Sequence, residues 1–166
     1  SACLVGSEMC IRDSTYYAVV YGLPNPLNGR IEANIGRSRF DRKKMAVLET
    51  GGKAAATNYK TLENFNGAAA LVQCNLETGR THQIRVHMAS IGCNLVGDQL
   101  YVKSKKTSLK GLDEETKAFV NVFPRQALHA ASLGFVHPRS GEKLQFSCGF
   151  PDDYLLLLDK LRGSRI

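Results

Sequence analysis

The chain lacks several features that mark whole classes of protein. No apolar run approaches the ~20 residues that a membrane-spanning helix needs, so the sequence predicts a soluble protein. The five cysteines are scattered and form no Cys-x-x-Cys pair, which argues against a disulfide framework and a structural zinc site. Internal repeats and low-complexity tracts are also missing. We therefore expect a metal-free protein of a reducing compartment such as the cytoplasm.

Acidic residues are fewer than basic ones. The 22 Lys and Arg against 15 Asp and Glu give a formal net charge of +7. A basic surface favours a polyanionic partner, because each phosphate that it neutralises releases condensed counterions. The length of 166 residues suits one domain, and 43% hydrophobic with 22% charged residues is ordinary globular composition.

Alternation of apolar and polar residues predicts a series of strands, and an Asn-Gly pair at 66–67 predicts a hairpin between two of them. The expected strands are Tyr16–Tyr21, Ile31–Ile35, Met45–Leu48, Ala55–Phe65, Ala68–Leu76, Ala127–Val136 and Lys143–Phe150. Helical spacing predicts a helix that Thr81 caps and Gly92 ends. Further helices are expected within Leu112–Val122 and Tyr154–Leu161. These elements predict an α+β fold, mainly an antiparallel sheet with a few flanking helices.

The densest polar cluster is the run TGRTHQIRVH at residues 78–87. A helix N-terminus beside Arg80 and Arg85 is an anion site on physical grounds, suited to a phosphate or to a carboxylate of the protein. The alternative is that Arg85 is a solvated helix residue and that the histidines are ordinary polar side chains. Two arginines, two histidines and a glutamine within so short a run favour the anion site.

Residues 76–89 (LETGRTHQIRVHMA), followed by VGDQLY at 96–101, closely resemble the signature of RluA-type RNA pseudouridine synthases. Three further stretches, at 16–22, 43–57 and 125–142, resemble family segments and occur in the family's order. The resemblance covers essentially everything after Ser14. It implies the pseudouridine synthase catalytic fold and a monomer that isomerises uridine to pseudouridine in structured ribosomal or transfer RNA.

The resemblance also implies roles for particular residues. These enzymes use an aspartate nucleophile and neither metal nor organic cofactor. Arg85 would pair with that aspartate, and Tyr16 would stack on the flipped uracil and act as the base in the final proton abstraction. The other candidates for substrate contact are Arg80, His82, Gln83 and Leu133. A buried nucleophilic aspartate needs such an arginine, because burial alone would raise its pKa.

The Arg-Leu-Asp motif that carries the family's nucleophile does not occur in this sequence. The resemblance stops at residues 1–14, which we interpret as a non-native segment ahead of a partial catalytic domain at 15–166. We expect the chain alone to be inactive. Asp98 lies in a Gly-Asp-x-Leu-Tyr turn, where we expect local hydrogen bonding and not a nucleophile's role.

Two other functions remain open. A non-catalytic RNA-binding module would use the basic segments 37–44 and 103–110 for phosphate contacts. A metal hydrolase would need His82, His87, Cys93 and Asp98, whose spacing matches no trusted zinc signature.

Overall fold

A computed structural model describes residues 14–102 and 109–164. The segment interpreted as non-native, residues 1–14, therefore lies outside the described part except for Ser14. Most of the basic segment 103–110 lies outside it as well. The described residues form a seven-stranded sheet of order β3-β2-β4-β5-β1-β6-β7, with every pairing antiparallel. Its strands are β1 (Thr15–Tyr21), β2 (Asn28–Arg37), β3 (Met45–Leu48), β4 (Lys53–Phe65), β5 (Ala69–Leu76), β6 (Leu128–Val136) and β7 (Lys143–Ser147).

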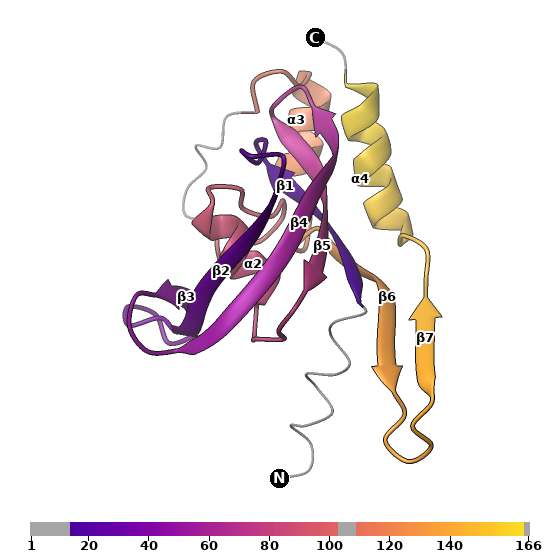
Figure 1. The fold of residues 1–166 in the computed structure, drawn as a ribbon. Coiled ribbons are helices and arrows are strands. Elements are labelled where there is room, and N and C mark those ends of the chain that lie inside the picture. Colours follow the sequence, from indigo (N-terminus) through magenta and orange to yellow (C-terminus); the bar gives the residue numbers. More distant parts are fainter. Residues whose placement is uncertain (1–13, 103–108, 165–166) are drawn as a thin grey trace.

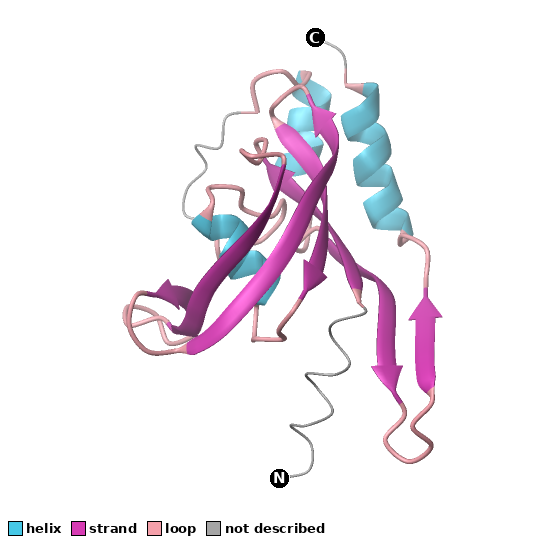
Figure 2. Cartoon of the chain, viewed as in Figure 1, coloured by secondary structure: helices cyan, strands magenta, loops and turns pink. Residues whose placement is uncertain are grey.

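The helices of the described residues are α2 (Gln83–Ser90), α3 (Glu114–Asn121) and α4 (Asp152–Gly163). Figure 2 shows the helices set against a strongly twisted sheet. The expected α+β class is confirmed, and each expected strand and helix overlaps an observed one. The predicted hairpin joins β4 to β5 through Asn66 and Gly67, both with positive φ, of 53° and 71°. This geometry is typical of the two-residue turns that Asn-Gly favours.

Strand β1 lies in the interior of the fold, with β5 on one side and β6 on the other (Figure 1). Its residues Ala18, Val19 and Val20 have no exposed surface, because both faces of the sheet are covered. On one face Val19 joins a core cluster with α3 and α4, and on the other Ala18 and Val20 join a cluster with α2. Alternate residues of β1 therefore point to two different cores.

Two parts of the sheet extend away from this core (Figure 1). One is the β6–β7 hairpin, on which Leu133 and Phe146 face each other and are 41% and 57% exposed. The other is the β2–β3 connection, residues 38–44, hereafter the basic loop. No helix among the described residues is long and apolar enough to cross a membrane.

Candidate active site

The polar run at residues 78–87 leads into helix α2, but the predicted cap is wrong. The N-cap is His82 and not Thr81, and it makes no side-chain capping hydrogen bond. His82 adopts a left-handed conformation with φ 57°, which turns the chain sharply into the helix. Thr81 is exposed just before this turn.

Gln83 replaces the expected cap with a set of internal hydrogen bonds. Its Oε1 accepts from the Thr78 hydroxyl at 2.8 Å and from the backbone N–H of Arg80 at 3.0 Å. Its Nε2 donates to the Ala56 carbonyl at 2.9 Å and to the Thr57 hydroxyl at 3.0 Å. With 3% of its surface exposed, Gln83 fastens the start of α2 to strand β4.

Arg85, in the same first turn of α2, forms a two-bond ion pair with Asp98. Its Nε donates to Oδ2 at 2.7 Å and its Nη2 to Oδ1 at 2.8 Å. The two side chains are 12% and 1% exposed, so Arg85 does not extend into bulk water. Hydrogen bonding to Asp98 raises the pKa of the Arg85 guanidinium, which stays charged at any working pH.

Asp98 also makes the local hydrogen bonds that were expected of it. Its Oδ1 accepts from the backbone N–H groups of Leu100 and Tyr101 at 3.1 and 3.2 Å. The ion pair with Arg85 was not predicted. A carboxylate held by two backbone donors and a guanidinium is fixed in orientation, and it fixes the arginine in turn.

Tyr101 joins this pair to the neighbouring elements. The Arg85 guanidinium lies 4.8 Å from the centre of the Tyr101 ring, which is within the range of a cation–π interaction. The Tyr101 hydroxyl accepts from the Met45 backbone N–H and contacts His82 Nδ1, both at 2.9 Å. Burial, with Arg85 nearby, lowers the pKa of His82, so the neutral ring can accept a hydrogen bond from the Tyr101 hydroxyl. Sequence reasoning missed Tyr101, although it stands three residues after Asp98.

Tyr16 belongs to the same face of the sheet as α2. It packs against the core cluster that contains Ile84 and Met88 of that helix. Leu133 lies one residue beyond Ser132, the β6 partner of Thr15, and so near the same end of β1. The structure therefore brings Tyr16 together with the helix that carries Arg85, and it brings Leu133 to the end of β1 that holds Tyr16.

Arg80 differs from the other candidates because its side chain turns toward strand β4. Its Nε donates to the Ala54 carbonyl at 3.1 Å. The backbone N–H of Gln83 donates to the Arg80 carbonyl at 3.0 Å, which uses one of the first-turn donors expected at an anion site. The geometry gives Arg80 a part in the entry to α2.

His87 is a buried residue of α2 with no exposed surface. Its Nδ1 lies 2.9 Å from the Thr57 hydroxyl, and its Nε2 has no hydrogen-bond partner among the described residues. Burial lowers the pKa of His87. Within residues 14–102 and 109–164, no three His, Cys, Asp or Glu side chains are grouped to hold a metal ion.

We expect His87 to make the fold sensitive to mild acid. The unfolded ring has a pKa near 6.5 and the folded ring a lower one, so the unfolded state binds more protons below that pH. Stability is then fully present above pH ~6.5 and falls below it, by up to ~1.4 kcal/mol per pH unit. Urea unfolding from pH 7.5 to 5 measures this slope. His87→Gln should flatten it. An equal slope in the wild type and in His87→Gln would contradict the prediction.

Comparisons with known proteins indicate a family for the chain. The family described as RNA pseudouridylate synthase matches residues 12–90. The chain is 46% identical over 147 residues to ribosomal large subunit pseudouridine synthase D of Zymomonas mobilis, covering 88% of this chain and 44% of that protein. It is 40% identical over 166 residues to the chloroplastic RNA pseudouridine synthase 2 of Arabidopsis thaliana, covering 92% and 39%. The chain thus spans less than half the length of these relatives.

A solved structure shows the same fold. Human RNA pseudouridylate synthase domain containing 4 superposes with a TM-score of 0.66 at 25% identity, covering 90% of this chain and 62% of that one. Sequence and structure therefore point to one family, and the segment that matches the family, residues 12–90, includes α2 with Arg85. The chain belongs to the RluA-type family of RNA pseudouridine synthases.

Proposed function

We propose that the protein isomerises uridine to pseudouridine in structured RNA, ribosomal or transfer, in the cytoplasm. The observation that carries the proposal is the buried Arg85 guanidinium on the same side of the sheet as Tyr16. The nucleophilic aspartate is supplied by an Arg-Leu-Asp motif that these 166 residues do not contain. The chain by itself is therefore inactive.

The reaction needs an ionised carboxylate in a site shielded from water. Arg85 serves this need, because a fixed positive charge offsets the cost of burying the aspartate and orients its oxygens. In the isomerisation the bond from N1 to C1′ breaks, the base turns, and C5 bonds to C1′. The C5 proton then leaves and N1 gains a proton, so the reaction needs neither metal nor organic cofactor.

Tyr16 is the surface on which the uracil rests. A base must leave its stack to be modified, and an aromatic ring in a stable strand is a suitable platform for it. Burial raises the pKa of Tyr16, which keeps its hydroxyl protonated near neutral pH. Of its two expected roles, stacking is therefore better supported than proton abstraction. We assign Leu133 to contact with the uracil as well, because it lies near the end of β1 that holds Tyr16.

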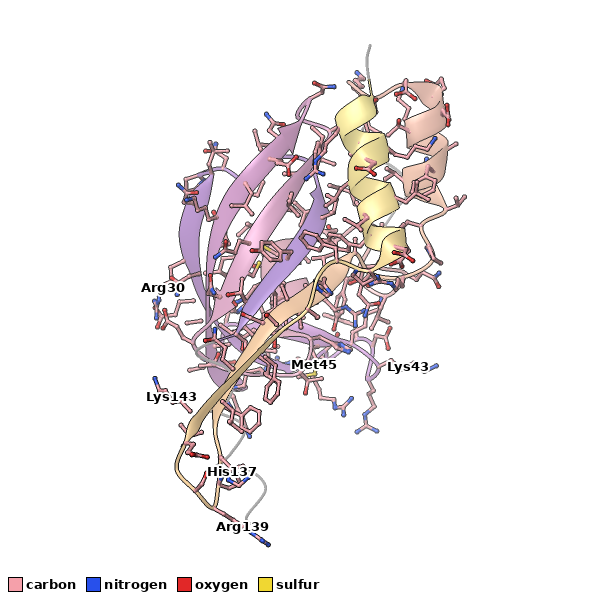
Figure 3. The ribbon with its side chains drawn as sticks, turned by 90° about the vertical axis from the view of Figure 1, so that its right-hand side faces the viewer. Arg30, Lys43, Met45, His137, Arg139 and Lys143 are labelled. Carbon is pink, nitrogen blue, oxygen red and sulfur yellow. The ribbon has the colours of Figure 1, made fainter. Side chains whose placement is uncertain are left out.

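The basic loop supplies RNA contacts beside this site. It carries Arg39, Arg42 and Lys43 at exposed positions, and Phe40 among them is 100% exposed. A solvated aromatic ring between cations is typical of surfaces that stack bases while the cations contact phosphates. Figure 3 shows Lys43 directed away from the body, with Arg139 at the tip of the separate β6–β7 hairpin.

Internal hydrogen bonds hold the basic loop in shape. The Ser38 hydroxyl accepts from the backbone N–H groups of Phe40 and Asp41 at 3.2 and 3.3 Å. Arg37 Nη1 donates to the Arg42 carbonyl at 2.9 Å. The loop leads directly to Met45, whose N–H contacts Tyr101. RNA held on the loop would thus lie close to Arg85.

Release of tritium from RNA labelled at uridine C5 tests the proposed function. We expect turnover by the full-length gene product and none by the 166-residue chain, because only the former carries the nucleophile. Arg85→Ala should abolish turnover in the full-length protein. Arg85→Lys keeps the positive charge and serves as the control for loss of folding.

Each other outcome contradicts one part of the proposal. Turnover by the 166-residue chain would show that the nucleophile lies within it. Isomerisation that survives Arg85→Ala would remove the role of Arg85. RNA binding by the full-length protein without any turnover on ribosomal or transfer RNA would favour the non-catalytic RNA-binding module.

A further inference from the structure

Asp98 is more deeply buried and more fully bonded than a turn residue requires. Its two oxygens accept four hydrogen bonds, two from Arg85 and two from backbone N–H groups of its own turn. The backbone bonds alone would hold the turn. The Asp98 carboxylate also accepts from Nε and Nη2 of the Arg85 guanidinium, which form the edge opposite Nη1.

The remaining Nη1 edge of Arg85 forms no hydrogen bond among the described residues. The ring of Tyr101 covers one face of the guanidinium at 4.8 Å. A guanidinium fixed along one edge and packed on one face can present its other donors in only one direction. The donors on this free edge are therefore oriented to bind a second carboxylate.

We propose that Asp98 is a positioning residue, which holds Arg85 so that its free edge meets the reacting aspartate in one orientation. This inference rests on the proposed function. Asp98 is not itself the nucleophile, because its side chain is 1% exposed and both oxygens are engaged. An oxygen in that state cannot approach a ribose or a base.

The test uses Asp98→Asn, which keeps an oxygen for the Leu100 and Tyr101 N–H groups but places an amide against the guanidinium. In the full-length gene product we expect kcat to fall by ~10²-fold, the scale set by a small misplacement of a reacting group. KM for RNA should change little, because Asp98 touches no RNA. Asp98→Glu, which keeps the charge, should recover part of kcat.

A matched control exists in the chain. Arg125 and Asp153 form a pair of the same geometry, with Nε to Oδ2 at 2.7 Å and Nη2 to Oδ1 at 2.8 Å. Asp153→Asn therefore makes the same chemical change at the start of α4 and should leave kcat unchanged. A fall in kcat without a change in KM in Asp98→Asn, but not in Asp153→Asn, would distinguish positioning from a general loss of stability.

A second readout needs no turnover. In the 166-residue chain with ¹⁵N-labelled arginine, Asp98→Asn should speed proton exchange at Arg85 Nε, whereas Asp153→Asn should speed it only at Arg125. If the wild type is active and Asp98→Asn has the same kcat, the inferred positioning role of Asp98 is wrong, but the proposed function still stands. Equal losses of kcat and RNA affinity in Asp98→Asn would also overturn it. An inactive full-length wild type would instead refute the proposed function.

Discussion

Arg85→Ala should lower the free energy of unfolding of the chain by about 3–5 kcal/mol, the cost of breaking a buried ion pair from one side. The loss exceeds the value of the contact itself, because the Asp98 carboxylate, which is 1% exposed, stays buried after its main partner is removed. Urea unfolding at pH 7 measures the effect, and the midpoint should shift without a change in slope.

Two further variants show whether the stranded charge is the cause. Arg85→Ala combined with Asp98→Asn should regain much of the loss, since the buried group is then neutral. Arg125→Ala breaks the pair with Asp153, whose side chains are 36% and 39% exposed, and should cost only about 1 kcal/mol. The prediction fails if Arg85→Ala is no more destabilising than Arg125→Ala.

Under the proposed function, the RNA affinity of the chain should fall by ~10³-fold between 50 and 200 mM salt, as expected if about six phosphate contacts release counterions. Changing Arg39, Arg42 and Lys43 of the basic loop together to glutamine should reduce the logarithmic salt slope by about 2–3. Fluorescence anisotropy with a labelled ribosomal RNA stem-loop measures both quantities.

The control changes the same amount of charge elsewhere. Lys117, Lys160 and Arg162 lie on α3 and α4, where each forms an ion pair with an acidic side chain. Their triple change to glutamine should leave the salt slope almost as in the wild type. If the two triple variants lose affinity equally, the basic loop is not the RNA surface and binding reflects net charge alone.

Much of the fold could be predicted because its signals are local. The β4–β5 hairpin needed only the Asn66-Gly67 turn between two alternating runs, and β1 was evident from its aromatic and β-branched residues. The position of β1 between β5 and β6 was not predictable from periodicity. It depends on pairings between residues that lie far apart in the sequence, such as Thr15 with Asn75 and Tyr16 with Ala130.

The site was predicted less completely for the same physical reason. Arg85 was found from its motif, but its partner Asp98 lies thirteen positions away and meets it only after the chain turns. The expected cap by Thr81 failed because Gln83 bonds to Ala56 and Thr57, which no local propensity could reveal. Tertiary hydrogen bonds therefore replaced a local cap.

The location of Tyr16 determines which molecule must deform during recognition. Its strand is paired along both edges, to Cys74 through β5 and to Ala130 through β6, so the ring cannot swing out on a moving segment. Under the proposed function, the uridine must therefore move to the ring, because the ring does not move to meet it. Under the proposed function, sites in bulges and loops, where unstacking costs least, should accordingly be modified faster than the same nucleotide within a duplex.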